Sequence, residues 1–469
     1  MSLQAARAKG AIATLQPALR RAVKAPLALT MGLLAFFLAN AFLLNGLIWS
    51  ASPEPHSVTV LKHSLDVLRG EGGDDSWGAM QVALDHVTEL PDTPLYSKVF
   101  FADQFRFQYP PSALFALAAM LAVDPDRVQV NDVYTGAWPA TNTVVGWVFI
   151  ALTALSVAAL LEVSLASLQP DIDWRQLRVL RALVVVGLTL TFYPVVKAFT
   201  LGQIQIWINA LFALGLLAWA AGWKMSSGVL IGAISLIKPH YGLFLLWAAL
   251  RREMRFAAAC AATIALGLAA SVTAYGLANH FDYLRVLSFL SQHGEAYYPN
   301  QSVNGVLNRL MSLSDPQAFV SLDLPAGKFP PFTSWVWVAT LMSSLALLLL
   351  ALLRPFRGDD RGRGIDLALM AVGCTMASPI AWEHHYGVTL PIYAVMLAAS
   401  LGDRSRLMWL GISYVLVSTF VPAANLLAAT PLNLLQSTLF AGAIVLFVLL
   451  STDKADSSSL CRREHHARA

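Results

Sequence analysis

Charged residues are scarce in this chain of 469 residues. Asp, Glu, Lys and Arg together make up 13% of it, and 57% of the residues are hydrophobic. An average soluble protein has about 25% charged residues. The composition therefore excludes a water-soluble globule, which cannot hide so much apolar surface. Apolar runs long enough to cross a hydrocarbon core of ~30 Å recur from Ala25 nearly to the C-terminus, so the sequence predicts an all-α, polytopic membrane protein without a separate soluble catalytic domain.

Cysteine is scarce too, with three residues in the whole chain. Cys260, Cys374 and Cys461 lie far apart in the sequence, which indicates neither a disulfide framework nor a thiolate metal site. The first apolar run, 26–49, lacks a cleavage site of small residues and is too long for the core of a signal peptide. We therefore expect an uncleaved first helix, and no metal or cofactor.

Lys and Arg are concentrated beside the predicted spans, and this orients them because cytoplasmic loops carry an excess of positive charge. Both termini are expected in the cytoplasm, as tails 1–24 and 452–469 around a single membrane domain, 25–451. We expect about 11 to 13 spans. The number depends on whether the short apolar run 112–123 crosses the membrane or re-enters it.

Two predicted external segments, 51–110 and 279–334, are too long to be simple connections, and such loops usually carry function. The second is rich in amides and aromatic residues. An amphipathic stretch of the first, 76–90, fits a helix at the membrane interface. Titratable residues of the first segment include Glu54, His56, Asp66, Asp74, Asp75, Asp85, Asp92 and Asp103.

The sharpest titratable cluster is Glu383-His384-His385, at the outer junction of two predicted spans. Adjacent imidazoles with a carboxylate can bind a phosphate, move a proton or ligate a metal. A lone interfacial His is more often a helix cap, but three titratable groups at one helix break favour a site. Zinc is the weaker interpretation, because adjacent His residues give poor geometry on one helix face and no H-E-x-x-H motif is present.

A second cluster, Lys238-Pro239-His240, lies at the outer end of a short predicted helix. A Lys close to the hydrocarbon is costly unless it is paired or functional, and a phosphate oxygen is its natural partner. Snorkelling to the interface is nearly as good an explanation for any single Lys, and both interpretations apply to Lys197.

Amides and prolines mark three further places. Gln203 and Gln205 follow Gly202 at the outer end of a span, and Asn300 and Asn304 lie in the second external segment. Their amides can hydrogen-bond a sugar or a phosphate, although each run alone is also compatible with a polar turn. The run FRFQYPPS, 105–112, has two prolines before a helix whose N-terminus favours an anion, or it is an ordinary proline-started helix with interfacial aromatic residues.

Taken in order, FRFQYPPS, LGQIQIW, LIKPHYG, NQSVNGVLNRL and SPIAWEHHYG resemble the motif series of glycosyltransferase family 87. The resemblance covers roughly residues 26–400. It implies a multi-span GT-C fold and a membrane hexosyltransferase that inverts the anomeric carbon, usually without a metal. The implied donor is a polyprenyl-phosphate sugar, with mannose the best guess, and the implied acceptor is a lipid or glycan. The implied location is the bacterial inner membrane with the active site on the external face, and no nucleic-acid partner is expected.

By the same resemblance, the donor phosphate is bound by Lys238, His240, His384 and His385. The sugar or acceptor is bound by Gln203, Gln205, Asn300, Asn304, Glu383 and Tyr109. The sequence departs from the family at the general base, because family members place an Asp about fourteen residues before a Gly, and counting back from Gly70 reaches His56. The candidates for the base are Glu54, His56 and Asp66, with Asp103 and Glu383 as further possibilities.

Two other classes of function remain open. A secondary transporter or flippase would use Lys197 and Lys238 as charges along a substrate path, although the polar groups gather toward one face rather than at the midplane. A non-enzymatic scaffold does not explain a face rich in Lys, His, Gln and Asn.

Overall fold

The chain is almost entirely helical, as predicted. The computed structural model describes residues 25–52, 59–124, 128–130, 133–135, 138–311, 329–354, 360–428 and 430–453. Its strands within these ranges are β1, Val128–Val130, and β2, Val133–Thr135, which form one short antiparallel hairpin. Glu54 and His56, the tail 1–24 and nearly all of the tail 452–469 lie outside the described residues.

Within the described ranges, five helices are long and apolar enough to cross a membrane. They are Ala25–Ala51, which includes the π-helical η1, Leu38–Leu44, and α2, Asn45–Ala51; Ala140–Leu168 in α6, Trp138–Leu168; α12, Met254–Tyr275; α16, Ser334–Leu353; and Pro431–Thr452, which includes η7, Pro431–Ser437, and α20, Thr438–Thr452. A sixth candidate is the pair α7, Arg178–Leu190, and α8, Tyr193–Thr200, bent by 57°. The polytopic membrane class is thereby confirmed, whereas the count of about 11 to 13 spans stays a prediction.

Shorter helices complete the bundle. They are α5, Leu114–Val123; α9, Gln205–Ala220; α10, Lys224–Ile237; α11, Leu243–Arg251; α17, Asp360–Ala377; α18, Thr389–Ser400; and α19, Arg404–Ser418. The run 112–123 forms η3, Pro111–Ala113, and then α5, and it is too short to count as a span by length. In the core, α9 packs against α6 and α10, and α10 packs against α12.

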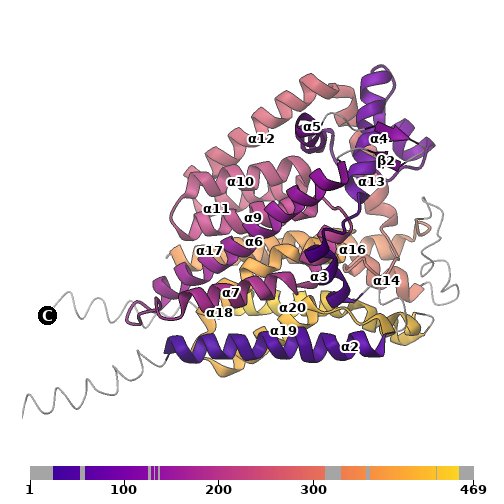
Figure 1. The fold of residues 1–469 in the computed structure, drawn as a ribbon. Coiled ribbons are helices and arrows are strands. Elements are labelled where there is room, and N and C mark those ends of the chain that lie inside the picture. The colour runs from indigo at the N-terminus through magenta and orange to yellow at the C-terminus, as the bar shows by residue number, and fades with distance from the viewer. Residues whose placement is uncertain are drawn as a thin grey trace, which may run out of the picture.

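The two segments predicted to be external form helices of their own. They are α3, Val60–Arg69; α4, Asp75–Glu89; the π-helical η2, Ser97–Ala102; α13, Leu277–His293; and α14, Val303–Met311. The amphipathic stretch predicted at 76–90 is thus α4 in the structure. Figure 1 shows α4, α5 and α13 together at one end of the bundle.

Besides η3 and η7, the described residues form further 3-10 turns: η4, Pro239–Gly242; η5, Glu383–Val388; and η6, Pro422–Leu427. Lys238 directly follows α10, and its backbone N–H still donates to the Ile234 carbonyl at 2.8 Å, whereas Pro239, which has no backbone N–H, starts the tighter turn η4. The break predicted at Lys238-Pro239-His240 is therefore present, and a second break at η5 carries the two adjacent His residues.

Buried ion pairs hold helices together where basic flanks were predicted to face the cytoplasm. Arg251 Nε on α11 lies 3.3 Å from the Asp366 carboxylate on α17, and Arg251 also donates to the Leu352 carbonyl of α16. Arg181 on α7 pairs with Glu162 on α6 at 2.8 Å. Arg251 and Arg181 therefore each join neighbouring helices of the bundle.

Candidate active site

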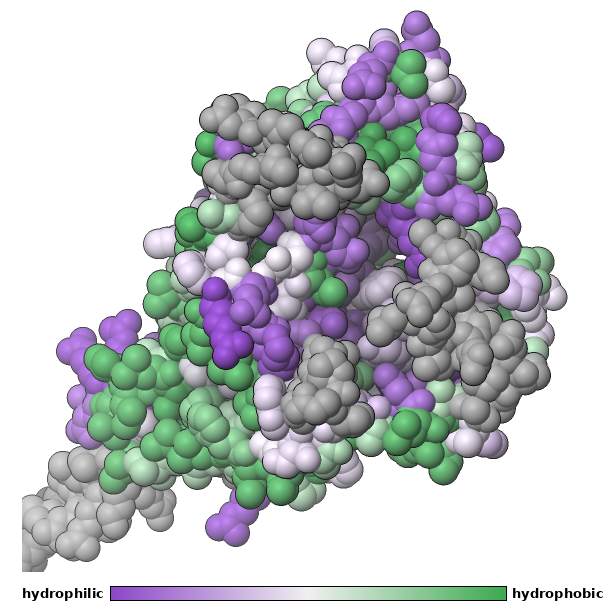
Figure 2. Space-filling view, turned by 45° about the vertical axis from the view of Figure 1, so that its right-hand side comes forward, coloured by the Kyte–Doolittle hydropathy of each residue, from purple (hydrophilic) through white to green (hydrophobic). Residues whose placement is uncertain are grey.

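A cavity of about 980 Å³ lies between the bundle and the external helices. Its walls come from α4, the segment 104–109, η4, α13, α16, α17 and the segment 378–385. Figure 2 shows hydrophilic side chains around a hollow in the molecular surface, with hydrophobic side chains over much of the bundle below. The cavity joins residues that are up to about 300 positions apart in the sequence, and only folding brings them together.

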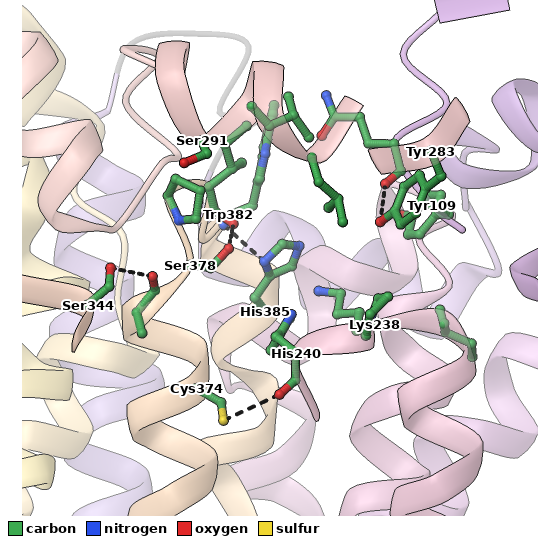
Figure 3. Close-up of a pocket in the computed structure, with 18 of the residues that line it drawn as sticks. Tyr109, Lys238, His240, Tyr283, Ser291, Ser344, Cys374, Ser378, Trp382 and His385 are labelled. Carbon is green, nitrogen blue, oxygen red and sulfur yellow. Dashed lines mark hydrogen bonds between the residues drawn. The ribbon is translucent and has the colours of Figure 1, made fainter. Parts of the chain in front are cut away.

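One wall of the cavity is basic. Lys238 and His240 reach it from the break after α10, and His384 and His385 reach it from η5. Figure 3 shows Lys238, His240 and His385 directed toward one shared space. The four residues predicted to surround a donor phosphate therefore line one cavity, on one side of the bundle.

Lys238 is partly buried in this wall. Its Nζ donates a 2.6 Å hydrogen bond to Oε1 of Gln205, whose Nε2 donates to Asn209 at 2.9 Å. In the part of the chain that the structure describes, no ion pair joins Lys238 to a carboxylate. A partly buried ammonium beside a neutral amide leaves its charge uncompensated, and an anionic ligand would compensate it.

The second external segment holds the two-histidine turn in place. The backbone N–H of Gln301 donates to the Ala381 carbonyl at 2.7 Å, and that of Glu383 donates to the Pro299 carbonyl at 3.0 Å. The backbone N–H of Trp382 donates to Nδ1 of His385 at 3.2 Å. Because Nδ1 accepts this bond, the neutral imidazole carries its proton on Nε2, which makes Nε2 a hydrogen-bond donor.

Asp75, the first residue of α4, is the acidic residue among those that line the cavity. Two backbone bonds hold its segment against the turn after α8: Gly73 donates to the Thr200 carbonyl and Asp75 to the Leu201 carbonyl, each at 2.9 Å. Gly202 makes this close approach possible. It has φ +68°, and a Cβ there would lie 1.9 Å from the Gly73 carbonyl oxygen.

Asp75 is accessible from the cavity, but protein atoms crowd around it. Burial raises the pKa of the Asp75 carboxyl above its usual value, and the nearby Asp74 acts in the same direction. A hydrogen bond from Gln203 Nε2 and the charges of Lys197 and Arg106 act against this rise. The result is a carboxylate with a raised proton affinity, as a general base requires.

Arg106 also lines the cavity. Its Nη1 lies 3.2 Å from the carboxylate of Glu295, and its guanidinium lies over the Phe329 ring, 4.9 Å from the ring centroid. Burial raises the pKa of the Glu295 carboxyl, although Arg106 opposes the shift. The pair links the first external segment to the second beside the cavity.

Several of the other predicted residues lie away from the cavity lining. Asp66 is on α3 and pairs with Lys62. Asn300 donates to the Glu295 and Pro379 carbonyls, and Asn304 accepts from the Glu295 backbone N–H at 3.1 Å, so both amides brace the external segment. Glu383 accepts a 2.8 Å hydrogen bond from the Tyr193 hydroxyl. Gln205 acts through Lys238, whereas Gln203 and Tyr109 do line the cavity.

Asp75 and Arg106 were not among the predicted site residues. Asp75 stands in a run of acidic residues with no distinguishing neighbour, and its link to Gly202 and Gln203 is a contact across more than a hundred residues. The start of an amphipathic helix directly after Gly72-Gly73 was the available signal. The glycines before such a helix allow the chain to turn, which can bring the first residue of the helix close to a site.

The cavity has an apolar side. It is lined by Leu243 at the start of α11, by Leu287 and Leu290 on α13, and by Trp337, Leu341 and Leu348 on α16. Leu341 is 50% exposed and Leu287 is 39% exposed, so this side of the cavity reaches the apolar outer surface of α13 and α16. The cavity thus combines a basic wall with an apolar opening.

The comparisons with known proteins agree with this geometry. The model of glycosyltransferase family 87 matches residues 107–379, more than half of the chain, and the chain belongs to this family. The matched region contains Tyr109, Gln203, Lys238 and His240, whereas Asp75 and the two adjacent His residues lie outside it.

Two curated relatives carry the name polyprenol-phosphate-mannose-dependent alpha-(1-2)-phosphatidylinositol mannoside mannosyltransferase. The protein of Mycolicibacterium smegmatis is 26% identical over 245 residues, 50% of this chain and 50% of the relative. The protein of Mycobacterium tuberculosis is 26% identical over 261 residues, 55% of this chain and 54% of the relative. The chain therefore spans about half the length of these relatives. No solved structure matches it.

Proposed function

We propose that this protein transfers a hexose, with mannose the first choice, from a polyprenyl-phosphate sugar to a lipid or glycan acceptor at the external face of a bacterial inner membrane, with both termini in the cytoplasm. The observation that carries the proposal is Lys238. Its uncompensated charge lies beside three imidazoles, in a cavity with an apolar side open toward lipid. Such a cavity suits a molecule with one anionic group and a long apolar chain.

The basic wall of the cavity suits the phosphate of the donor, and its apolar side suits the polyprenyl chain. The phosphate lies at Lys238, His240, His384 and His385, where an ammonium and imidazole N–H groups can donate to its oxygens. The first isoprene units lie along the apolar side, between α11, α13 and α16, and leave toward the bilayer past Leu341. The sugar then occupies the space between the basic wall and Asp75.

The reaction is a direct displacement. Asp75 accepts the proton of the acceptor hydroxyl, the hydroxyl oxygen forms a bond to the anomeric carbon, and the bond from that carbon to the phosphate oxygen breaks. The polyprenyl phosphate leaves with an additional negative charge, which Lys238 and the imidazoles stabilise. The attacking and leaving oxygens lie on opposite sides of the carbon, so the configuration inverts.

In this proposal Asp75 is the general base, a role for which the sequence suggested other residues. Asp66 is paired with Lys62 outside the cavity lining, whereas Asp75 is part of that lining. The proposals for Glu54 and His56 stay as the sequence made them, because both residues lie outside the described ranges. For the acceptor, the names of the two relatives point to a mannosylated phosphatidylinositol, and we propose a lipid-linked polyol or mannoside of this kind.

The test is a donor panel with the purified protein in lipid nanodiscs. Polyprenyl phosphates that carry mannose, glucose, galactose or arabinose are supplied with candidate acceptor lipids, and released polyprenyl phosphate is measured by mass spectrometry. We expect release with at least one donor, dependent on an acceptor. Absence of release with every donor, together with uptake of a labelled substrate into proteoliposomes, would replace the transferase by the transporter.

A further inference from the structure

Gln203 has two different neighbours at the two ends of its amide. Its Nε2 donates to Oδ2 of Asp75, and its Oε1 lies 2.7 Å from the Ser76 hydroxyl and 3.1 Å from the Tyr109 hydroxyl. The backbone N–H of Ile204 donates to the Ser76 oxygen at 3.1 Å, which occupies one of that oxygen's lone pairs. Gln203 itself is buried.

These neighbours fix which way the amide points. In the observed orientation, the amide oxygen meets two hydroxyl groups that can donate, and the amide nitrogen meets a carboxylate that accepts. Rotation of the amide by half a turn would place its oxygen against the Asp75 oxygen, and no hydrogen would lie between them unless Asp75 were protonated. An ionised Asp75 can only accept, so it selects this orientation, and the hydroxyl groups of Ser76 and Tyr109, which lie 3.0 Å from each other, hold the amide oxygen in place.

The same contacts leave one carboxylate oxygen available. Oδ2 of Asp75 accepts from Gln203, and the structure gives Oδ1 no hydrogen-bond partner among the described residues. Asp75 lines the cavity, as does Tyr109. A hydrogen bond to one oxygen only limits the rotation of the carboxylate and leaves the other oxygen free to accept from a ligand in the cavity.

We propose that Gln203 is a positioning residue for the base: its amide, held in place by Ser76 and Tyr109, keeps Asp75 ionised and aims Oδ1 at the acceptor hydroxyl. This inference rests on the proposed function, in which Asp75 is the base. It replaces the sugar-binding role that the sequence suggested for Gln203 and Tyr109. The other charges that act on Asp75 are Asp74 directly before α4, Lys197 on α8 and Arg106 beside the cavity, and they are the same in every variant below.

The test measures the titration of Asp75 directly. Infrared difference spectra of the purified protein in nanodiscs are recorded against pH, and the carboxyl band of Asp75 is identified by its loss in Asp75→Asn. Gln203→Met removes the donor and nearly keeps the volume. The double variant Ser76→Ala/Tyr109→Phe keeps Gln203 but removes both hydroxyl groups, so the amide is free to turn.

We expect the titration midpoint of Asp75 to rise by about one pH unit or more in Gln203→Met, because a hydrogen bond to a charged group is lost. The double variant should raise it as well, and each single hydroxyl variant should raise it less. Tyr283→Phe is the matched control: Tyr283 lines the same cavity, but its hydroxyl donates to the Gln108 carbonyl at 3.2 Å and does not touch the network. Its midpoint should equal that of the wild type.

Activity adds a second readout. The acid limb of the kcat profile should move upward with the infrared midpoint, while the KM for the donor stays within about twofold, because the contacts to the phosphate are intact. An unchanged midpoint in Gln203→Met and in the double variant overturns the inference, and so does a rise in donor KM without a shift of the acid limb, which would make Gln203 a sugar ligand. Wild-type protein without turnover refutes the proposed function instead, and the infrared titration still decides the role of Gln203.

Discussion

The Nζ of Lys238 lies 2.6 Å from Oε1 of Gln205, so the partly buried cation of the cavity is held by a neutral amide. We expect Lys238→Met to lower kcat/KM by about 10²- to 10³-fold, the usual loss when one preorganised donor to a developing charge is removed. Affinity for polyprenyl phosphate should fall too. The measurement is release of polyprenyl phosphate under initial-rate conditions. Lys98→Met is the control, because Lys98 pairs with Asp103 and does not line the cavity, and it should behave as the wild type.

Replacement of the base should separate chemistry from binding. Asp75→Asn is expected to lower kcat by about 10²- to 10⁴-fold, the range for a general base. Donor affinity should stay nearly constant, because the phosphate contacts are at the other wall. Asp74→Asn and Asp66→Asn are matched controls, and neither residue lines the cavity. A large loss of kcat in Asp66→Asn with normal folding would return the role to the residue that the sequence suggested.

The pH dependence follows from the raised pKa of Asp75. The base works only when ionised, so activity should be lost as the pH falls through this pKa, and the acid limb should lie above about 3.9, the unperturbed value for Asp. The same shift acts on stability. A raised carboxyl pKa means that the folded state binds the proton more tightly than the unfolded state. The contribution of Asp75 to stability is therefore complete below its unfolded pKa of about 3.9 and is lost as the pH rises from there through the folded pKa. Rates from pH 3.5 to 9 with a pH-stable donor provide the check.

Gly202→Ala should lower activity because it strains the backbone and displaces the segment that carries Asp75. The substitution carries a left-handed backbone cost of about 1–2 kcal/mol. It also places a Cβ 1.9 Å from the Gly73 carbonyl, which forces the Asp75 segment away. Gly222→Ala separates the two effects, because Gly222 has φ +83° and nothing within 4 Å of a new Cβ. We expect both variants to lower the thermal unfolding temperature, and only Gly202→Ala to lower kcat by an order of magnitude or more.

The ion pair at the opposite end of the bundle should affect stability alone. Asp366 is fully buried and Arg251 is 5% exposed, so Asp366→Ala leaves a buried cation without its partner. A loss of about 3–5 kcal/mol is expected. Lys98→Met removes a pair with Asp103 in which both side chains are at least a third exposed, and it should cost less than about 1 kcal/mol. Unfolding in detergent, followed by fluorescence, distinguishes them; equal effects would contradict the assignment of Asp366 to the core of the bundle.

The sequence predicted the membrane class and the basic wall because both depend on local features. Apolar runs define the spans, and Pro239 marks the break that exposes Lys238, whatever the rest of the chain does. The two adjacent His residues stand at another helix break. The four basic residues were assigned to one face from the parity of the spans, and the structure places them in one cavity.

The position of Asp75 in the cavity could not be predicted in the same way. Asp75 is brought to the cavity by backbone bonds to the segment after α8, a pairing across more than a hundred residues that has no periodic signature. From the sequence, the amides of Asn300 and Asn304 were expected to bind the sugar or the acceptor. In the fold, they form hydrogen bonds to the backbone of Glu295. A residue type indicates which groups can bind a sugar; only the tertiary contacts show which of them are already bound to the protein.

The most direct measurement is a cryo-EM structure of the protein in nanodiscs with a non-hydrolysable phosphonate analogue of the donor. The account predicts phosphonate density within hydrogen-bond distance of Lys238 and the two adjacent His residues, a tail that leaves between α11 and α16, and Asp75 on the far side of the sugar. Density for the phosphonate at another place, or a central cavity with gates at both faces and no donor beside Lys238, would contradict it.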